Sequence, residues 1–284
     1  MFAKLPIILE DIKFEHTLFA LPFALMSAFI ASGGVPLWGK LFWILVAMVG
    51  ARSAAMSFNR VIDADYDRKN IRTGKRAIPL ERLTKKHYAV FILLSIGLFE
   101  LACYQLNFLA FTLSPAALFI LLFYSYTKRF TIFSHFFLGL ALGIAPVGAW
   151  VAVKEEISLV SLVIGISVLL WTAGFDMIYA CQDIEFDKEQ RLYSFPVKFG
   201  IRFSLRFSYF LHIIVMIMLF MLVFIAGLRY IYCIGWLMIS LLLIYEHHIV
   251  KPYDLSRVNM AFFTINGAVS LLLMFFTLFD IIYG

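Results

Sequence analysis

Long apolar stretches separated by short polar segments make up most of the chain. The stretches run to about 18–25 residues, the length of a helix that crosses a hydrocarbon core of ~30 Å. Backbone groups in lipid must find their hydrogen bonds within the protein, and these stretches are too long for barrel strands, so helices are expected. The pattern predicts nine spans, at residues 17–35, 40–59, 88–106, 108–127, 134–153, 158–179, 204–226, 230–250 and 259–281.

The pattern predicts an all-α integral membrane protein with a single transmembrane domain over residues 1–284. The number of spans depends on the short polar break at Gln105–Asn107, which separates spans three and four. Residues 1–16 are amphipathic and carry acidic side chains, and they lack the apolar core of a signal peptide. We expect them to form an interfacial helix that leads into the first span.

Composition supports the membrane assignment. Hydrophobic residues make up 63% of the chain and charged residues 15%, whereas soluble domains are about half apolar and about a quarter charged. Cys103, Cys181 and Cys233 lie in or beside apolar stretches without paired spacing. Neither a disulfide framework nor a cysteine-based zinc site is therefore indicated.

The distribution of positive charge predicts an orientation in the membrane. The net charge is +6, but the basic residues occupy short loops between apolar runs, so no nucleic-acid partner is expected. With the N-terminus in the cytoplasm, 20 of the 24 Lys and Arg residues lie in cytoplasmic segments. Three lie in outer loops and one, Arg52, lies within a span. This asymmetry follows the positive-inside rule and favours a cytoplasmic N-terminus.

Two polar motifs with the same spacing follow spans two and six, so both face the cytoplasm. Their members lie at positions i, i+4 and i+8, which places three side chains on one face of a helix. The motifs are Asn59, Asp63 and Asp67 on a helix that continues span two, and Tyr179, Asp183 and Asp187 at the end of span six. The two regions form a weak internal repeat.

Carboxylates at the edge of a membrane are costly unless a cation compensates them. Mg²⁺ accepts oxygen ligands and commonly binds one or two carboxylates together with substrate phosphates. The alternative interpretation is that the acidic residues are ordinary solvated helix ends, paired with nearby Lys and Arg. That interpretation would be sufficient for a single acidic cluster. Two matched clusters on the same side of the membrane favour a pair of metal-binding faces that hold a diphosphate between them.

Basic residues near the motifs suit a phosphate ligand. Arg72 and Arg76 follow the first motif, and Tyr124 and Lys128 lie four residues apart at the inner end of span four. Arginine binds phosphate through two nitrogens and lysine acts as a point charge. The alternative explanation for these residues is the positive-inside rule, which places cations in cytoplasmic loops without a function in binding. We prefer this explanation for Lys69, Lys85 and Lys86.

Arg52 lies seven residues before Asn59, two helical turns deeper and on roughly the same face. An arginine within the membrane indicates a functional site. It could pair with an Asp of the motifs or bind an anionic acceptor such as an aromatic carboxylate. Asp176 is expected to face the same cavity or to contribute to helix packing.

Three histidines near the inner ends of spans show no metal-ligand partner at useful spacing. We interpret them as interface residues. They are His16, His247 and His248.

The chain resembles the UbiA superfamily of intramembrane aromatic prenyltransferases, best its 4-hydroxybenzoate polyprenyltransferase-like branch. The resemblance is carried by FEHTLFALPFA at 14–24, ARSAAMSFNRVIDADYD at 51–67 followed by RTGKRAIP, and AGFDMIYACQDIEFDKEQRLYSFPVKFG at 173–200. It implies nine helices around a cavity that opens laterally to lipid, and two motifs that bind a prenyl diphosphate through Mg²⁺.

The resemblance also implies roles for individual residues. Asp63, Asp67, Asp183 and Asp187 would be catalytic and, with Asn59, would bind the metal. The residues matching diphosphate contacts are Arg72, Arg76, Tyr124 and Lys128. Tyr179 would also bind the substrate, because of its place in the second motif. Arg52 would lie near the aromatic acceptor. Two departures, Ala77–Glu81 in place of Pro-Leu-Pro-Ser-Gly and Arg191 in place of a glycine, affect loop conformation and acceptor choice.

The expected activity is transfer of a polyprenyl group to 4-hydroxybenzoate or a dihydroxynaphthoate, in ubiquinone or menaquinone biosynthesis at a bacterial inner membrane. The form YACQDIEFD favours the menaquinone-associated members. Haem- or chlorophyll-modifying transferases, a divalent-cation transporter and a lipid-binding scaffold rank lower. The sequence does not specify the acceptor, the prenyl chain length, the base that removes the ring proton or the oligomeric state.

Overall fold

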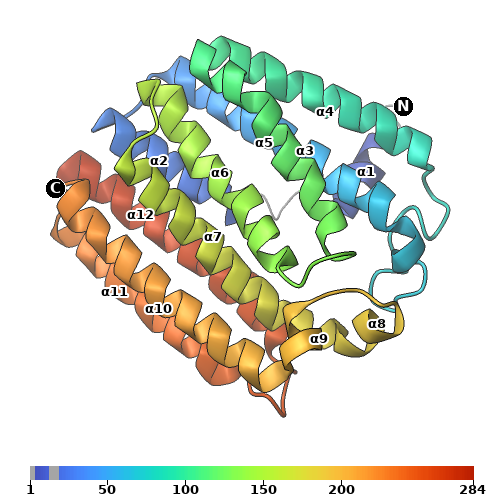
Figure 1. Cartoon of the computed structure of the whole chain (residues 1–284). Coiled ribbons are helices and arrows are strands. Elements are labelled where there is room, and N and C mark those ends of the chain that lie inside the picture. The colour runs from blue at the N-terminus through green and yellow to red at the C-terminus, as the bar shows by residue number, and fades with distance from the viewer. Residues whose placement is uncertain (1–3, 13–18) are drawn as a thin grey trace.

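The computed structural model describes residues 4–12 and 19–284, and the regular elements in these residues are helices. Figure 1 shows the long helices side by side in one bundle. The long helices are α2 (Leu21–Ser32), α3 (Trp38–Asp67), α4 (Lys85–Leu106), α5 (Phe108–Thr127), α6 (Ser134–Lys154), α7 (Leu159–Ala180), α10 (Ile201–Ile225), α11 (Tyr230–Ile249) and α12 (Asn266–Tyr283). The short elements are α1 (Leu5–Asp11), η3 (Cys181–Asp183), α8 (Ile184–Glu189), α9 (Phe195–Phe199) and η4 (Met260–Ile265).

Eight helical segments of the described chain are long and apolar enough to cross a membrane, and α2 is a shorter ninth apolar helix. The predicted all-α membrane fold is therefore confirmed. Large apolar side chains such as Leu93, Phe119 and Phe224 are exposed on the bundle, as expected of a surface that faces lipid chains. The first predicted span began at residue 17, which lies outside the described residues, as does His16.

The break between spans three and four is a true helix boundary. Asn107 is extended, and its side-chain oxygen accepts a hydrogen bond from the backbone nitrogen of Ala110 at the start of α5. An asparagine in this position caps a helix N-terminus by satisfying a backbone donor. The Asn107 amide nitrogen also donates to the backbone oxygen of Val151 on α6. One polar residue thus ends α4, begins α5 and attaches both to α6.

The centre of the bundle is formed by close contact between α6 and α7, with α2 against α6 and α10 against α7. Glycines make this approach possible. A Cβ atom at Gly139 would collide with the backbone of Leu169, and one at Gly143 would collide with the backbone of Gly165. Small residues at helix interfaces let backbones meet closely, a common arrangement in membrane bundles.

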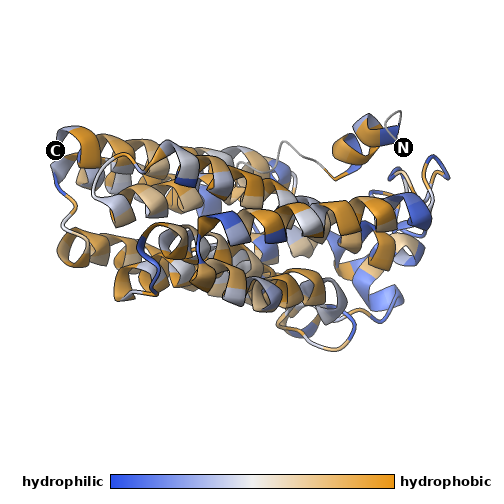
Figure 2. Ribbon diagram, turned by 90° about the horizontal axis from the view of Figure 1, so that it is seen from above, coloured by the Kyte–Doolittle hydropathy of each residue, from blue (hydrophilic) through white to orange (hydrophobic). Residues whose placement is uncertain are grey.

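Two helices extend beyond the apolar layer at the same end of the bundle. The polar end of α3 continues without interruption to Asp67, as the motif spacing predicted. The polar end of α7 continues through η3 into α8, so a single 3₁₀ turn separates Tyr179 from Asp187. Figure 2 shows hydrophilic residues gathered at the end of the bundle near α1, away from the C-terminus. Both polar motifs therefore lie at one end of the molecule.

Candidate active site

A cavity of about 820 Å³ lies between α3, α5, α6 and α7 and reaches from the polar end into the apolar layer. Every residue that the sequence predicted as a site residue lines this cavity. These residues are Arg52, Asn59, Asp63, Asp67, Arg72, Arg76, Tyr124, Lys128, Tyr179, Asp183 and Asp187. The structure thus brings together side chains from both motifs, from the loop after α3 and from the end of α5.

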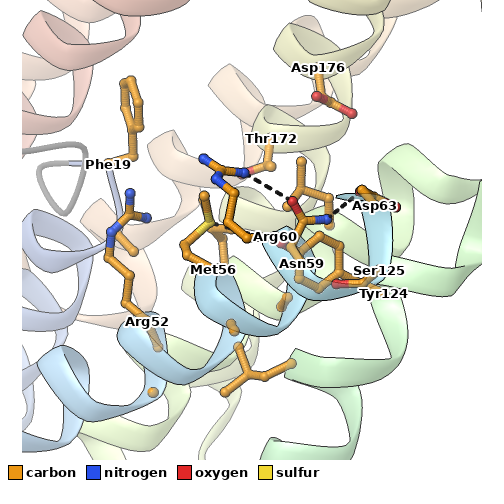
Figure 3. Close-up of a pocket in the computed structure, with 18 of the residues that line it drawn as sticks. Phe19, Arg52, Met56, Asn59, Arg60, Asp63, Tyr124, Ser125, Thr172 and Asp176 are labelled. Atoms are coloured by element: carbon orange, nitrogen blue, oxygen red, sulfur yellow. Dashed lines mark hydrogen bonds between the residues drawn. The ribbon is translucent and has the colours of Figure 1, made fainter. Parts of the chain in front are cut away.

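The first motif forms a connected row on α3. The Asn59 amide nitrogen donates to Asp63 Oδ2 at 2.8 Å, and the Asn59 oxygen accepts from Arg60 Nη1 at 3.2 Å (Figure 3). Arg129 Nη2 lies 3.4 Å from Asp63 Oδ1. Asp63 is therefore held from two sides, by an amide of its own helix and by a guanidinium from the end of α5.

The loop after α3 places one arginine on each motif. Arg76 Nη1 lies 2.6 Å from Asp67 Oδ2 in the first motif. Arg72 Nη2 lies 2.5 Å from Asp183 Oδ2, and its Nη1 donates to the Tyr179 hydroxyl at 3.0 Å. Burial would lower the pKa of Arg72, but the neighbouring Asp183 carboxylate raises it above its ordinary value. Arg72 therefore joins the first motif's loop to the second motif as a permanent cation.

Lys128 lies between the two motifs. Burial would lower the pKa of Lys128, but the carboxylates of both motifs and of Asp176 outweigh burial and raise it. A lysine with a raised pKa keeps its positive charge through neutral and alkaline pH. Its backbone oxygen accepts a hydrogen bond from Tyr193 N at 2.7 Å, which ties the end of α5 to the segment after α8.

The oxygen atoms of the two motifs suit a hard cation. Asp187 is buried, and its Oδ2 has no hydrogen-bond partner among the described residues. A buried carboxylate oxygen without a donor is costly, and a divalent cation removes that cost. Asp63 and Asp183 face the same cavity from opposite motifs. The residues present therefore fit Mg²⁺ bound on each motif.

The deeper part of the cavity is apolar. Its walls include Leu113, Ala117, Ile144 and Gly148. Arg52 lies at this level, and in Figure 3 its side chain extends from α3 toward Phe19. The cavity thus combines a polar mouth with a deeper apolar chamber, which Arg52 also lines.

A model of the UbiA prenyltransferase family matches residues 20–277 of the chain. The chain belongs to the UbiA prenyltransferase family. The 4-hydroxybenzoate octaprenyltransferase of Francisella tularensis subsp. mediasiatica is 31% identical over 62% of this chain and 62% of its own length, so the match spans less than two thirds of that relative. The enzyme of the same name from Paraburkholderia phytofirmans is 31% identical over 70% of this chain and 71% of its own length.

Solved UbiA homologues share the fold. The apo UbiA homologue of Aeropyrum pernix K1 superimposes with a TM-score of 0.83 at 30% identity and covers 91% of this chain and 95% of its own. The Archaeoglobus fulgidus homologue bound to DMAPP and Mg²⁺ superimposes with a TM-score of 0.67 at 19% identity, over 93% of this chain and 98% of its own. The predicted family is therefore confirmed.

Sequence reasoning missed three side chains that organise this UbiA-family cavity. Arg60 bonds to Asn59 and to the backbone oxygen of Asp11 at 2.9 Å. Arg129 contacts Asp63. His135 Nδ1 lies 2.6 Å from Asp176 Oδ2, so Asp176 faces the cavity and also joins α7 to α6. The sequence signal was present only for Arg129, which is adjacent to Lys128.

His247, interpreted from the sequence as an interface residue without a metal-ligand partner at useful spacing, has two groups beside it in the structure that could bind a metal. Its Nε2 lies 2.9 Å from Nδ1 of His212, and Glu246 lies beside both. His248, the next residue, is exposed. The partner of His247 lies on α10, 35 residues away, so spacing along α11 could not identify it.

Proposed function

We propose that this chain transfers a polyprenyl group from a prenyl diphosphate to an aromatic acid, 4-hydroxybenzoate or a dihydroxynaphthoate, in quinone biosynthesis. The observation that carries the proposal is the cavity itself. Two matched carboxylate motifs and several basic side chains form its polar mouth, and the mouth opens into an apolar chamber. A prenyl diphosphate has the same division into an anionic head and an apolar tail.

The chain's basic residues would bind the diphosphate. In the structure Arg72 and Arg76 pair with Asp183 and Asp67. When a diphosphate and its cations arrive, the carboxylates would take the cations and the arginines would turn to the phosphate oxygens, which they bind with two nitrogens. Lys128, between the motifs, would face the leaving diphosphate. Bound Mg²⁺ would supply neutralisation of the charge on the leaving group.

The apolar chamber would protect the allylic cation that forms when the C–O bond breaks. Its walls at Leu113, Ala117 and Ile144 carry no group that could attack the cation. Arg52 would hold the carboxylate of the acceptor, so that the ring carbon beside the hydroxyl faces the cation. The ring proton would then leave to an Asp of either motif or to diphosphate.

The named relatives favour 4-hydroxybenzoate among the acceptors, because the Francisella and Paraburkholderia proteins are 4-hydroxybenzoate octaprenyltransferases. The form of the second motif favours a dihydroxynaphthoate. The positive-inside count supports placing the polar end of the bundle in the cytoplasm of a bacterial inner membrane. A UbiA-type transferase acting on another acceptor is the second candidate.

An acceptor panel tests the proposal. Membranes containing the protein would be incubated with Mg²⁺, a labelled prenyl diphosphate and, separately, 4-hydroxybenzoate, a dihydroxynaphthoate and a glycerol phosphate lipid. We expect labelled product from one of the two aromatic acids. Product from the lipid alone would establish the second candidate, and no product from any acceptor would contradict prenyl transfer.

Arg52 is predicted to control acceptor binding. Replacing it with Gln removes a charged hydrogen-bond donor worth about 1.5–3 kcal/mol, so KM for the aromatic acid should rise roughly 10- to 100-fold. The KM for the prenyl diphosphate should stay unchanged in steady-state assays. The acceptor's parent phenol, which has no carboxylate, is the control: wild type and Arg52→Gln should use it equally poorly. Equal loss with both acceptors would contradict the assignment.

A further inference from the structure

A second polar cluster lies away from the cavity, between α10 and α11. It consists of His212 on α10 and of Glu246 and His247 on α11, and none of the three lines the cavity described above. One ligand atom from each residue lies within 4.8 Å of the others. His212 and Glu246 are 0% exposed and His247 is partly buried. Ionisable groups in this setting are costly, so their presence requires an explanation.

The hydrogen bonds of His212 determine which ring nitrogen carries its proton. Its Nε2 lies 3.2 Å from the backbone oxygen of Trp171, which can only accept. Nε2 is therefore protonated, and the lone pair of Nδ1 points toward Nε2 of His247, 2.9 Å away, and Oε2 of Glu246, 3.4 Å away. A histidine that binds a metal through one nitrogen usually donates from the other to a carbonyl or carboxylate.

The carboxylate of Glu246, like the His212 ring, has one polar atom fixed by a hydrogen bond and the other directed at the cluster. Its Oε1 accepts a hydrogen bond from Nδ2 of Asn266 at 2.7 Å, while its Oε2 has no hydrogen-bond partner among the described residues. The Asn266 oxygen accepts from Nε1 of Trp171 at 2.8 Å, which orients the amide. One oxygen of the carboxylate is therefore anchored, and the other is directed at the two imidazoles.

We propose that His212 Nδ1, His247 Nε2 and Glu246 Oε2 bind a divalent transition-metal ion, Zn²⁺ by ligand type. Two imidazoles and one carboxylate are a common zinc ligand set, and imidazole does not suit Mg²⁺. Ligand atoms about 2.1 Å from a tetrahedral ion lie roughly 3.4 Å apart. The distance of 3.4 Å between His212 and Glu246 already has this value, and the imidazoles need to separate only slightly.

The neighbouring helices are shaped around this cluster. A Cβ atom at Gly174 on α7 would collide with the His212 ring, so glycine is needed for His212 to reach its position. On α12, Asn266 follows the π-helical turn η4 and donates to the backbone oxygen of Ala261 within it. π-Helical turns are rare and frequently mark functional sites.

A bound ion would join α10 and α11 and, through Asn266, would fix the start of α12. The turn η4 carries Phe262 and Phe263, which line the cavity and pack against Tyr179 with ring centroids 4.2 and 6.0 Å apart. The metal would thus stabilise one wall of the cavity without contacting a substrate. This role is separate from that of Mg²⁺ at the two motifs.

Elemental analysis of the purified full-length protein in detergent tests the proposal. We expect about one zinc per chain, removed by a strong chelator and restored by Zn²⁺ with a rise in Tm that Mg²⁺ does not reproduce. Co²⁺ added to the stripped protein should give the visible absorption of a four-coordinate ion. Failure of the stripped wild type to bind either ion stoichiometrically would overturn the proposal, whatever its prenyl-transfer activity.

Variants assign the ligands. Glu246→Gln and His247→Ala should lose stoichiometric zinc and the absorption of bound Co²⁺, whereas His248→Ala, at the exposed neighbouring position, should retain both. Zinc retained at full stoichiometry in His247→Ala would overturn the assignment. If a variant does not fold, the wild-type Co²⁺ spectrum decides: the absorption of an octahedral ion would exclude the compact three-ligand site.

Discussion

Replacing Asp63 with Asn should lower the rate of prenyl transfer by about a hundred- to a thousandfold, the effect of removing one preorganised electrostatic group from an active site. The substitution keeps the shape of the side chain but removes the charge that would hold a cation beside the diphosphate. The equivalent change in the second motif, Asp183→Asn, should have an effect of the same size. The rate would be measured with saturating acceptor and prenyl diphosphate over a range of Mg²⁺ concentrations.

The chain provides a matched control for each substitution. Asp65 and Glu185 each lie two residues after a motif carboxylate and are exposed; the Asp65 side chain is 80% exposed beside Lys85. Asp65→Asn and Glu185→Gln should leave the rate unchanged. The motif variants should also need more Mg²⁺ for half-maximal rate. If Asp65→Asn lowered the rate as much as Asp63→Asn, the loss would reflect the total negative charge at this end of the bundle. A specific role of the motif carboxylates would then be contradicted.

The arrangement of the first motif could be predicted from sequence because it depends on a single helix. Positions 59, 63 and 67 share a face wherever α3 continues beyond the apolar layer, and it continues to Asp67. The second motif was less regular than its spacing suggested, because η3 replaces one α-helical turn. Tyr179 and Asp183 nevertheless contact the same guanidinium, that of Arg72.

Contacts between distant segments could not be predicted in this way. The partner of Asp63, just after α5, and the partner of Asp176, on α6, depend on how helices pack, which spacing within one helix does not specify. The same limit applies to His212 and His247. The position of η4 also depends on packing, because its sequence, Met260–Ile265, is an ordinary apolar run.

The site's electrostatics connect these elements. Four motif carboxylates are balanced by cations from two separate segments: Arg72 and Arg76 in the loop after α3, and Lys128 and Arg129 directly after α5. In the proposed function, a diphosphate with its metal ions would bring both signs of charge to this site. The cations of the chain could then exchange carboxylate partners for phosphate partners without leaving the cavity.

Among these cations, Lys128 should have the largest effect on the rate of prenyl transfer. Lys128→Met should lower the rate of prenyl transfer by at least about a hundredfold, because it removes a partly buried cation that lies near both motifs and, in the proposed function, would face the leaving diphosphate. Since its neighbouring carboxylates raise the pKa of Lys128, the wild-type amine stays charged through neutral and moderately alkaline pH. The pH–rate profile of the variant should therefore keep its shape while its height falls.

Lys69 provides the control for Lys128. It is an exposed lysine at the same end of the bundle, where its Nζ donates to Oε1 of Gln190 at 3.1 Å. Lys69→Met should retain the wild-type rate, and Lys128→Arg should recover part of the rate lost in Lys128→Met, because it restores the charge with a different shape. A Lys128→Met protein that folds, binds prenyl diphosphate and turns over at the wild-type rate would show that the leaving group is stabilised without this lysine. In that case Arg72 and Arg76 would remain as the chain's cations for the diphosphate, and Arg72→Gln would become the variant with the larger loss.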